Sequence, residues 1–221
     1  MSKSAGRFIG VVIVFITSLA FAQTLNPGVD RWAIKTSLLP HSQRKNVSLR
    51  SLLALSNPIE SKSKEYNAER IPTLVEGDLK EGDLVTTTGW LELVALEDDA
   101  KKHRDGDYHI QLRNYSAWAD SCLIVEIPFP DFIEDTKLKE SCAKARAFVK
   151  ERLLGGNEPS KKGTPLIHPA YVRITGQLFF DAAHLHGGLR GKTPKGYPLM
   201  HSYTCWEIHP VVVIAFSPLP K

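Results

Sequence analysis

Apolar and polar residues alternate along five segments between residues 84 and 214, and each segment is predicted to be a β-strand. In the clearest of them, Tyr108, Ile110 and Leu112 alternate with His109 and Gln111. A period of two places successive side chains on opposite faces, so one face of this strand should be apolar and the other polar. The five predicted strands are residues 84–96, 107–113, 122–127, 171–181 and 204–214.

A helical pattern lies between the third and fourth predicted strands. Pro128 and Pro130 end the third strand, and Gly155-Gly156 ends the helical pattern. Between these points, apolar and small residues recur at helical spacing: Leu138, Cys142, Ala145, Val149 and Leu153. We therefore predict one helix, which should close one end of the β structure.

The order of these elements is typical of a small closed barrel of the OB-fold type. Gly89 lies inside the long first strand, where a glycine lets a barrel strand bend sharply. The predicted fold is mainly β: a five-stranded OB-fold-like barrel, with one helix between strands three and four, at residues 81–221. Barrels of this type serve many functions, so the function must be argued from individual residues.

Residues 23–80 are the least regular part and are predicted to form an irregular N-terminal extension and linker. Residues 32–37 have a short strand-like pattern, and residues 47–55 form a second short element with helical character. Residues 56–72 are polar and contain prolines, which is typical of a loop.

The first 22 residues have the pattern of a secretory signal peptide. Lys3 and Arg7 precede an apolar stretch at residues 8–19, and Ala20-Phe21-Ala22 is an expected cleavage site before Gln23. We therefore expect an exported protein, periplasmic or extracellular, that does not span the membrane after cleavage. The alternative is that the apolar stretch stays as an uncleaved anchor.

Overall charge says little about the ligand. Loss of residues 1–22 lowers the formal charge from +4 to +2, because they contain two basic residues and no acidic one. Proteins that bind phosphate backbones usually have a strong positive charge or a basic patch. Nucleic acid is therefore neither favoured nor excluded by the overall charge.

The chain has three cysteines, so at most one intramolecular disulfide can form. Cys122 and Cys205 lie at the starts of the third and fifth predicted strands, which run side by side in an OB-fold barrel. A disulfide between them is therefore one hypothesis. Buried free thiols are the alternative, and Cys142 competes for either partner.

Several segments together resemble a family of small uncharacterised bacterial proteins, often exported, with an OB-fold-like barrel. The segments are RWAIKT at 31–36, DGDYHI at 105–110, IVEIP at 124–128, VRITG at 172–176 followed by FFD at 179–181, and WEIHPV at 206–211. The resemblance covers most of the expected mature chain. It implies the fold and the exported location and assigns no chemistry.

Histidines and carboxylates near the predicted strands form a candidate metal site. The candidate ligands are His109, Asp181, His184, Glu207 and His209. Zinc and similar ions take three or four nitrogen and oxygen ligands. The spacing matches no known metal motif, so hydrogen bonds that hold the barrel closed are the alternative. No cofactor is predicted other than this divalent metal.

Basic residues gather in the loops that join strands one to two and four to five, which flank the ligand groove of an OB-fold barrel. The candidate ligand-binding residues are Lys101, Lys102, Arg104, Arg190 and Lys192. The leading hypothesis is therefore an exported binding module. Its ligand would be an anionic polymer, either nucleic acid or polysaccharide, or a protein partner. Solvated charged loops are the alternative.

Two other functions are kept as alternatives. A metal-dependent hydrolase or phosphodiesterase would use the candidate metal ligands, and a structural envelope protein would use the same residues only for stability. No catalytic residue is assigned, because the chain has no G-x-S-x-G motif and no Cys/His pairing that indicates a nucleophile. The sequence thus leans away from an enzyme.

Overall fold

A computed structural model of the chain describes most of the residues that follow the expected signal peptide. The described residues are 31–40, 42–58, 69–72, 74–97, 105–114, 121–185 and 189–220. The expected signal peptide lies outside this part. None of the described helices is long and apolar enough to cross a lipid bilayer.

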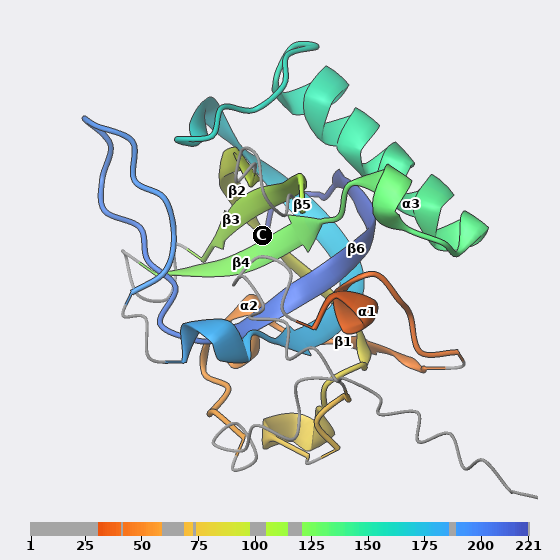
Figure 1. Cartoon of the computed structure of the whole chain (residues 1–221). Helices are drawn as coiled ribbons and strands as arrows, with labels where there is room; N and C mark the ends of the chain where they lie inside the picture. Colours follow the sequence, from red (N-terminus) through yellow and green to blue (C-terminus); the bar gives the residue numbers. More distant parts are fainter. Residues whose placement is uncertain are drawn as a thin grey trace, which may run out of the picture.

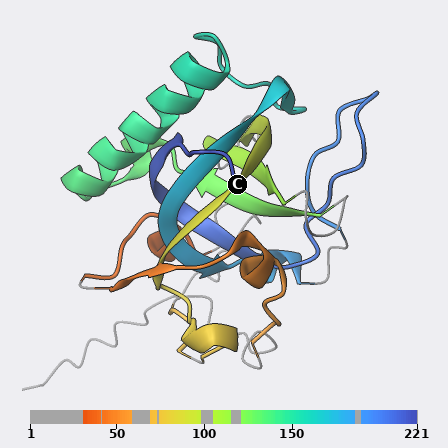
Figure 2. The same ribbon diagram turned by 180° about the vertical axis from the view of Figure 1, so that it is seen from behind.

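The protein is mainly β, with six strands in one mixed sheet that closes in a ring (Figures 1 and 2). The strands follow the order β1-β2-β3-β4-β6-β5, and a further pairing of β2 with β5 closes the ring. Their bounds are β1 Arg44–Asn46, β2 Leu84–Glu97, β3 Asp107–Arg113, β4 Cys122–Ile127, β5 Thr164–Phe180 and β6 Trp206–Phe216. The five strands predicted from alternation are therefore present, and β1 is an addition.

The third and fifth predicted strands, which correspond to β4 and β6, were expected to lie side by side. They are parallel, with Ile124 opposite Glu207 and Val125 opposite Ile208.

β5 begins at Thr164, seven residues before the predicted start. Its extra residues pair with the far end of β2, where Pro165 lies opposite Leu93.

The apolar core lies inside the ring, and β3, β4 and β5 contribute alternate residues to it. Tyr108, Ile110 and Leu112 of β3 are at most 1% exposed and belong to this core, in which Ile110 lies opposite Val125 of β4. Gly89 in β2 is required by packing, since a Cβ there would lie 2.7 Å from the Leu49 side chain. The glycine therefore lets β2 run close to the extension.

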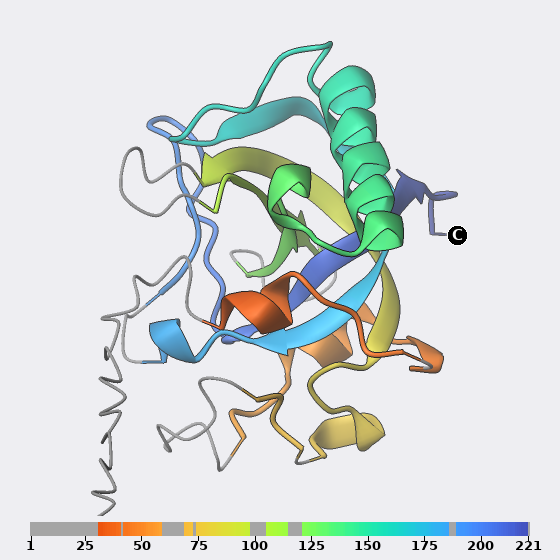
Figure 3. The same cartoon turned by 45° about the vertical axis from the view of Figure 1, so that its right-hand side comes forward.

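The predicted helix between β4 and β5 is α3, Thr136–Ala147, which continues as a π-helical turn, Phe148–Leu153. It begins at Asp135, whose side chain accepts a hydrogen bond from the backbone N–H of Leu138 at 2.7 Å. Its apolar face, including Leu138, Cys142 and Val149, joins the core cluster. The helix lies along one side of the ring near β4 and β6 (Figure 3).

The N-terminal extension differs from the prediction at residues 32–37. The strand prediction was wrong, since this segment contains a short helix, α1, Trp32–Lys35. Arg31 explains the difference, because its guanidinium contacts Glu81 at 2.6 Å and the carbonyl of Phe180 at 2.8 Å. These contacts hold the segment across the end of β5 instead of along a strand. The second short element is helical, as expected: α2, Leu49–Leu53.

The three cysteines are buried free thiols, so the predicted disulfide between Cys122 and Cys205 is not formed in the structure. The two thiols lie in different apolar clusters. Cys122 packs with Leu93, Ala95 and Met200, whereas Cys205 belongs to the main core. Cys122 donates its backbone N–H to the carbonyl of His201, and Ser121 forms an isolated parallel bridge with His201, so the segment around His201 lies beside the start of β4.

Candidate functional site

Polar residues on β3, β4 and β6 form a face of the ring that points away from the apolar core and is nevertheless buried. In β3, for example, Asp107 and His109 alternate with the core residue Tyr108. The buried residues of this polar face are Asp107, His109, Gln111, Glu126, Glu207 and His209. Burial of so many polar groups is costly unless each finds a partner.

α1 and the connection between β5 and β6 cover the polar face. Lys35 of α1 is 3% exposed, and its Nζ lies 5.5 Å from the centre of the Phe179 ring. From the connection, Arg190 forms an ion pair with Glu207, and the backbone N–H of Lys192 donates to Gln111. Figures 1 and 3 show α1 on the outside of the ring beside β6.

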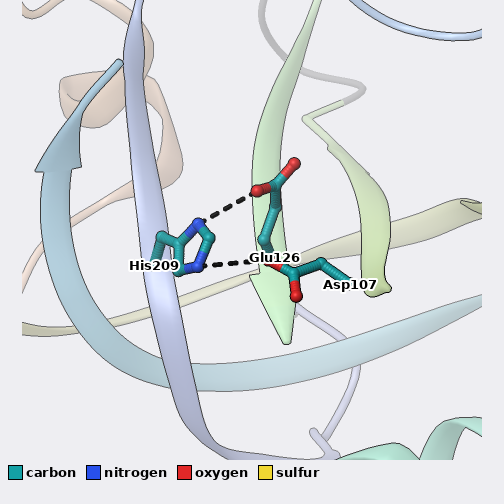
Figure 4. A group of neighbouring side chains, drawn as sticks. All are labelled: Asp107, Glu126 and His209. Carbon is teal, nitrogen blue, oxygen red and sulfur yellow. Dashed lines mark ion pairs between the residues drawn. The ribbon is translucent and has the colours of Figure 1, made fainter. Parts of the chain in front are cut away.

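Asp107, Glu126 and His209 form a compact group at the centre of the polar face (Figure 4). The Nε2 atom of His209 lies 3.4 Å from Oδ2 of Asp107, and its Nδ1 atom lies 2.9 Å from Oε2 of Glu126. One ligand atom from each residue lies within 4.8 Å of the other two. Within the described ranges, no other group of His, Cys, Asp and Glu side chains meets this spacing. We call these three residues the metal-competent triad.

Polar atoms at the centre of the triad lack hydrogen-bond partners among the described residues. They are Oδ2 of Asp107 and both ring nitrogens of His209, whose ion-pair contacts do not have hydrogen-bond geometry. The other oxygen of Asp107 accepts the backbone N–H of Phe129 at 3.0 Å, which fixes the orientation of this carboxylate. The ion pairs compensate the charges of these groups, but their capacity for hydrogen bonding is not used. A ligand between these atoms would use it.

Burial and mutual contact shift the pKa values of the triad. Burial raises the pKa of Asp107 to about 6, against the attraction of His209. Burial would lower the pKa of His209, but its contacts with Glu126 and Glu207 raise it to about 9. The pKa of Glu126 lies well below its usual range, because His109 and His209 outweigh the effect of burial. At neutral pH, a protonated His209 therefore faces an ionised Glu126.

Two further groups complete the charge balance around Glu126. His109 places its Nδ1 atom 3.1 Å from the other carboxylate oxygen of Glu126 and 3.4 Å from Glu97. Burial would lower the pKa of Lys35, but the surrounding carboxylates, Glu126 foremost, raise it above the usual lysine value. Lys35 is therefore charged, and the polar face holds cations and carboxylates in close proximity.

A second group of charges surrounds Arg190 at the edge of the polar face. Its guanidinium lies 3.0 Å from Oδ2 of Asp181 and also contacts Glu207. Nδ1 of His184 lies 2.6 Å from the same oxygen of Asp181. Glu207 connects this group to the triad, since its Oε2 atom lies 3.9 Å from Nδ1 of His209. The two groups thus form one continuous charged network.

The structure brings the predicted metal ligands into one region but does not arrange all of them around one point. Of the five, His209 belongs to the metal-competent triad. His109 and Glu207 lie beside it on the polar face. Asp181 and His184 pair with each other, and Asp181 also pairs with Arg190.

The predicted anion-binding residues that the structure describes are occupied by internal contacts. Arg190 is 9% exposed and paired with two carboxylates. Lys192 forms an ion pair with Glu97 at 2.9 Å. Lys101, Lys102 and Arg104 lie outside the described residues. The two described candidates, Arg190 and Lys192, are therefore already paired with carboxylates of the protein itself.

Sequence reasoning missed three residues of the site. Asp107 and Glu126 were noted only within motifs of the resembling family. The signal for Glu126 was available, because it is the one charged residue in the otherwise apolar strand from Cys122 to Ile127. Lys35 gave no such signal, since it reaches the site from a segment predicted to be a strand.

The His184–Asp181 ion pair predicts a dependence of stability on pH. The hydrogen bond with Asp181 raises the pKa of His184 above 6.5. The stability that protonated His184 contributes to the fold is therefore complete below pH 6.5 and is lost as the pH rises through the raised pKa. Burial would raise the pKa of Asp181, but His184, Lys35 and Arg190 lower it below 3.8. The stability that ionised Asp181 contributes to the fold is complete above pH 3.8 and is lost as the pH falls through the lowered pKa.

His184→Gln is therefore expected to reduce the melting temperature more at pH 5.5 than at pH 8.5. Thermal melts of the wild-type protein and the variant at both pH values provide the measurement. His168→Gln is the matched control, since His168 is exposed and has no partner among the described residues. A deficit that is the same at both pH values would contradict the assignment of the ion pair.

Comparison of the chain with protein-family models, curated proteins and solved structures found no match. The protein is therefore defined by its own architecture. It is a mainly β protein whose six-stranded mixed sheet closes in a ring and carries a buried polar face. The particular feature of that face is the metal-competent triad.

Proposed function

We propose that this protein is an exported OB-fold-type barrel that binds one divalent cation through Asp107, Glu126 and His209. The order of the strands, the parallel pairing of β4 with β6 and the position of α3 support the OB-fold assignment. The N-terminal pattern of basic, apolar and small residues supports export.

The observation that carries this proposal is the convergence, in the triad, of ligand atoms that form ion pairs but no hydrogen bonds with one another. A carboxylate oxygen and imidazole nitrogens without hydrogen bonds meet a second carboxylate within 4.8 Å. One histidine with two carboxylates is a donor set that suits zinc, manganese and similar divalent ions. Binding would displace the proton of His209 and compensate two carboxylates that lie in a buried environment.

Hydrolysis is the second candidate function, and the number of protein ligands favours it. Structural zinc sites use four protein ligands, whereas catalytic sites use three and keep one position for water or substrate. One carboxylate oxygen of Glu207 has no hydrogen bond and lies 3.9 Å from Nδ1 of His209, so a proton acceptor lies beside the triad. Ion binding remains the first candidate, because α1 and the residues around Arg190 cover the face.

Binding of an anionic polymer receives less support from the described residues. The basic residues assigned to that role, where described, already neutralise Asp181, Glu207 and Glu97. A ligand phosphate would have to displace these carboxylates. The metal proposal requires no such exchange.

Metal titration of the purified protein after chelator treatment tests the proposal. We expect binding of about one equivalent of zinc or manganese, measured by elemental mass spectrometry. At a metal concentration of 100 times the dissociation constant, the gain in the free energy of unfolding is about 2.7 kcal/mol. For a chain of this size, this gain corresponds to a rise in melting temperature of roughly 5–10 °C.

Asp107→Asn and Glu126→Gln are expected to abolish both the stoichiometric metal and the rise in melting temperature. Asp131→Asn and Glu134→Gln are the matched controls, because both residues are exposed. Circular dichroism establishes whether each variant folds. Absence of metal binding in the wild-type protein, or wild-type binding by folded Asp107→Asn and Glu126→Gln variants, would overturn the proposal.

A further inference from the structure

A small pocket lies on the outside of the ring, over β1, β2, β5 and β6. Its volume is about 250 Å³. The lining residues are Arg44, Asn46, Thr86, Arg173, Thr175 and Val213. None of them belongs to the polar face or to the metal-competent triad, so this pocket is a separate feature of the molecule.

The register of the strands builds the pocket. Asn46 lies opposite Thr86, Thr86 opposite Thr175, and Thr175 opposite Val213, so these four residues form one row across four strands. Strand partners in such a row place their side chains on the same face. The floor of the pocket is therefore a row of short side chains from segments far apart in the sequence.

Two arginines flank this row from opposite directions along the strands. Arg44 lies two residues before Asn46 in β1, opposite Leu84 of β2. Arg173 lies two residues before Thr175 in β5, opposite Thr88 of β2. Leu84 and Thr88 are on either side of Thr86, so the two guanidinium groups approach the row from its two sides.

The hydroxyl groups of Thr86 and Thr175 provide a donor at the floor of the pocket. Their Oγ1 atoms lie 2.7 Å apart and share one hydrogen bond. Two hydroxyls have two protons, and this bond uses only one of them. The other proton is therefore left to donate to a ligand, from residues that are only 8% and 6% exposed.

Positive charge in the pocket is not compensated by the described residues. Arg44 and Arg173 are exposed and form no ion pair or hydrogen bond among them. The next outward-facing positions along β2, β5 and β6 are uncharged: Thr88, Trp90, Tyr171 and Ala215. This arrangement contrasts with Arg190 and Lys192, which are paired with carboxylates.

We propose that this pocket binds a single phosphate group, either as free phosphate or as the end of a small phosphate monoester. Two guanidinium forks, a hydroxyl and the Asn46 amide are donors that match the oxygens of a tetrahedral anion. The volume is smaller than the roughly 300–1,000 Å³ of sites for drug-sized molecules. The phosphate group, rather than the organic part of a monoester, should therefore determine the affinity.

Titration of the purified protein with inorganic phosphate and with glycerol phosphate, followed by the NMR shifts of backbone amides, tests this inference. Sodium chloride at matched ionic strength is the reference. We expect saturable shifts at residues 44–46, 86, 173–175 and 213 with the phosphates and none with chloride. Tighter binding of inorganic phosphate identifies free phosphate as the ligand, and tighter binding of glycerol phosphate identifies a monoester.

Arg44→Gln and Arg173→Gln are each expected to weaken phosphate binding roughly tenfold, since each removes a charge-assisted contact. Arg173→Lys should restore part of the affinity, because the charge is kept while the guanidinium fork is lost. Arg50→Gln, on the exposed side of α2, is the matched control and should bind as the wild type does. All three positions tolerate substitution because their side chains are exposed.

Equal phosphate affinity in the wild type, Arg44→Gln and Arg173→Gln would overturn the inference. Shifts that chloride reproduces at the same ionic strength would overturn it as well. Neither result depends on the metal-competent triad, so the metal proposal stands or falls separately.

Discussion

Arg190→Ala is expected to lower the free energy of unfolding by about 3–5 kcal/mol, the usual cost of removing one partner from a buried ion pair. Arg190 is the described partner shared by Asp181 and Glu207, and the side chains of both carboxylates are at most 4% exposed. Without the guanidinium, each of these two buried carboxylates loses a compensating positive charge. A loss of this size is a large part of the stability of an ordinary domain.

Urea unfolding followed by tryptophan fluorescence provides the measurement for Arg190→Ala. Lys192→Ala is the control, because its ion pair with Glu97 is partly exposed and such pairs contribute about 0–1 kcal/mol. An equally small loss in both variants would show that Arg190 does not hold the carboxylates together in solution.

Glu81→Ala is expected to have an effect of similar size, about 3–5 kcal/mol, since it removes the carboxylate partner of a buried arginine. The Glu81 carboxylate accepts two hydrogen bonds from Arg31 at 2.6 Å each. It also accepts the backbone N–H groups of Ile71 at 2.7 Å and Phe180 at 2.9 Å. Its loss releases the segment that contains α1 from the end of β5.

Hydrogen exchange distinguishes this local release from general destabilisation. In Glu81→Ala, the amides of residues 34–36 should exchange faster than those of β3 and β4. Glu76→Ala is the control, since Glu76 is exposed and its side chain has no partner among the described residues. Unchanged protection of residues 34–36 in a folded Glu81→Ala variant would contradict the role of this anchor.

Alternation along the chain predicted the strands well because each strand has one face in the core. β3 begins and ends where the pattern of Tyr108, Ile110 and Leu112 placed it. The parallel pairing of β4 with β6 followed from the order of the elements. Local pattern was sufficient wherever apolar core residues alternate with polar residues along a strand.

Local pattern was insufficient where distant residues determine the conformation. The helix α1 depends on Arg31, whose partner Glu81 is 50 residues away and whose partner Phe180 is 149 residues away. β1 has only three residues and is defined by its pairing with β2. Neither element has a periodicity of its own that is long enough to predict it.

The sequence predicted some of the residues of the candidate site but not which of them would lie together. His209 was expected to be a ligand, but its partners Asp107 and Glu126 come from two other strands. Their meeting depends on the register of β3 with β4 and of β4 with β6, which alternation does not specify. The phosphate pocket has the same origin, because Thr86 and Thr175 meet only through the pairing of β2 with β5.

The contacts of Arg31 also impose an order on the assembly of the molecule. The carbonyl that it contacts belongs to Phe180, the last residue of β5. The first described segment of the chain is therefore synthesised early and completed late, since its docking position does not exist until β5 has been made. During that interval, Arg31 and α1 have no docking position on the sheet.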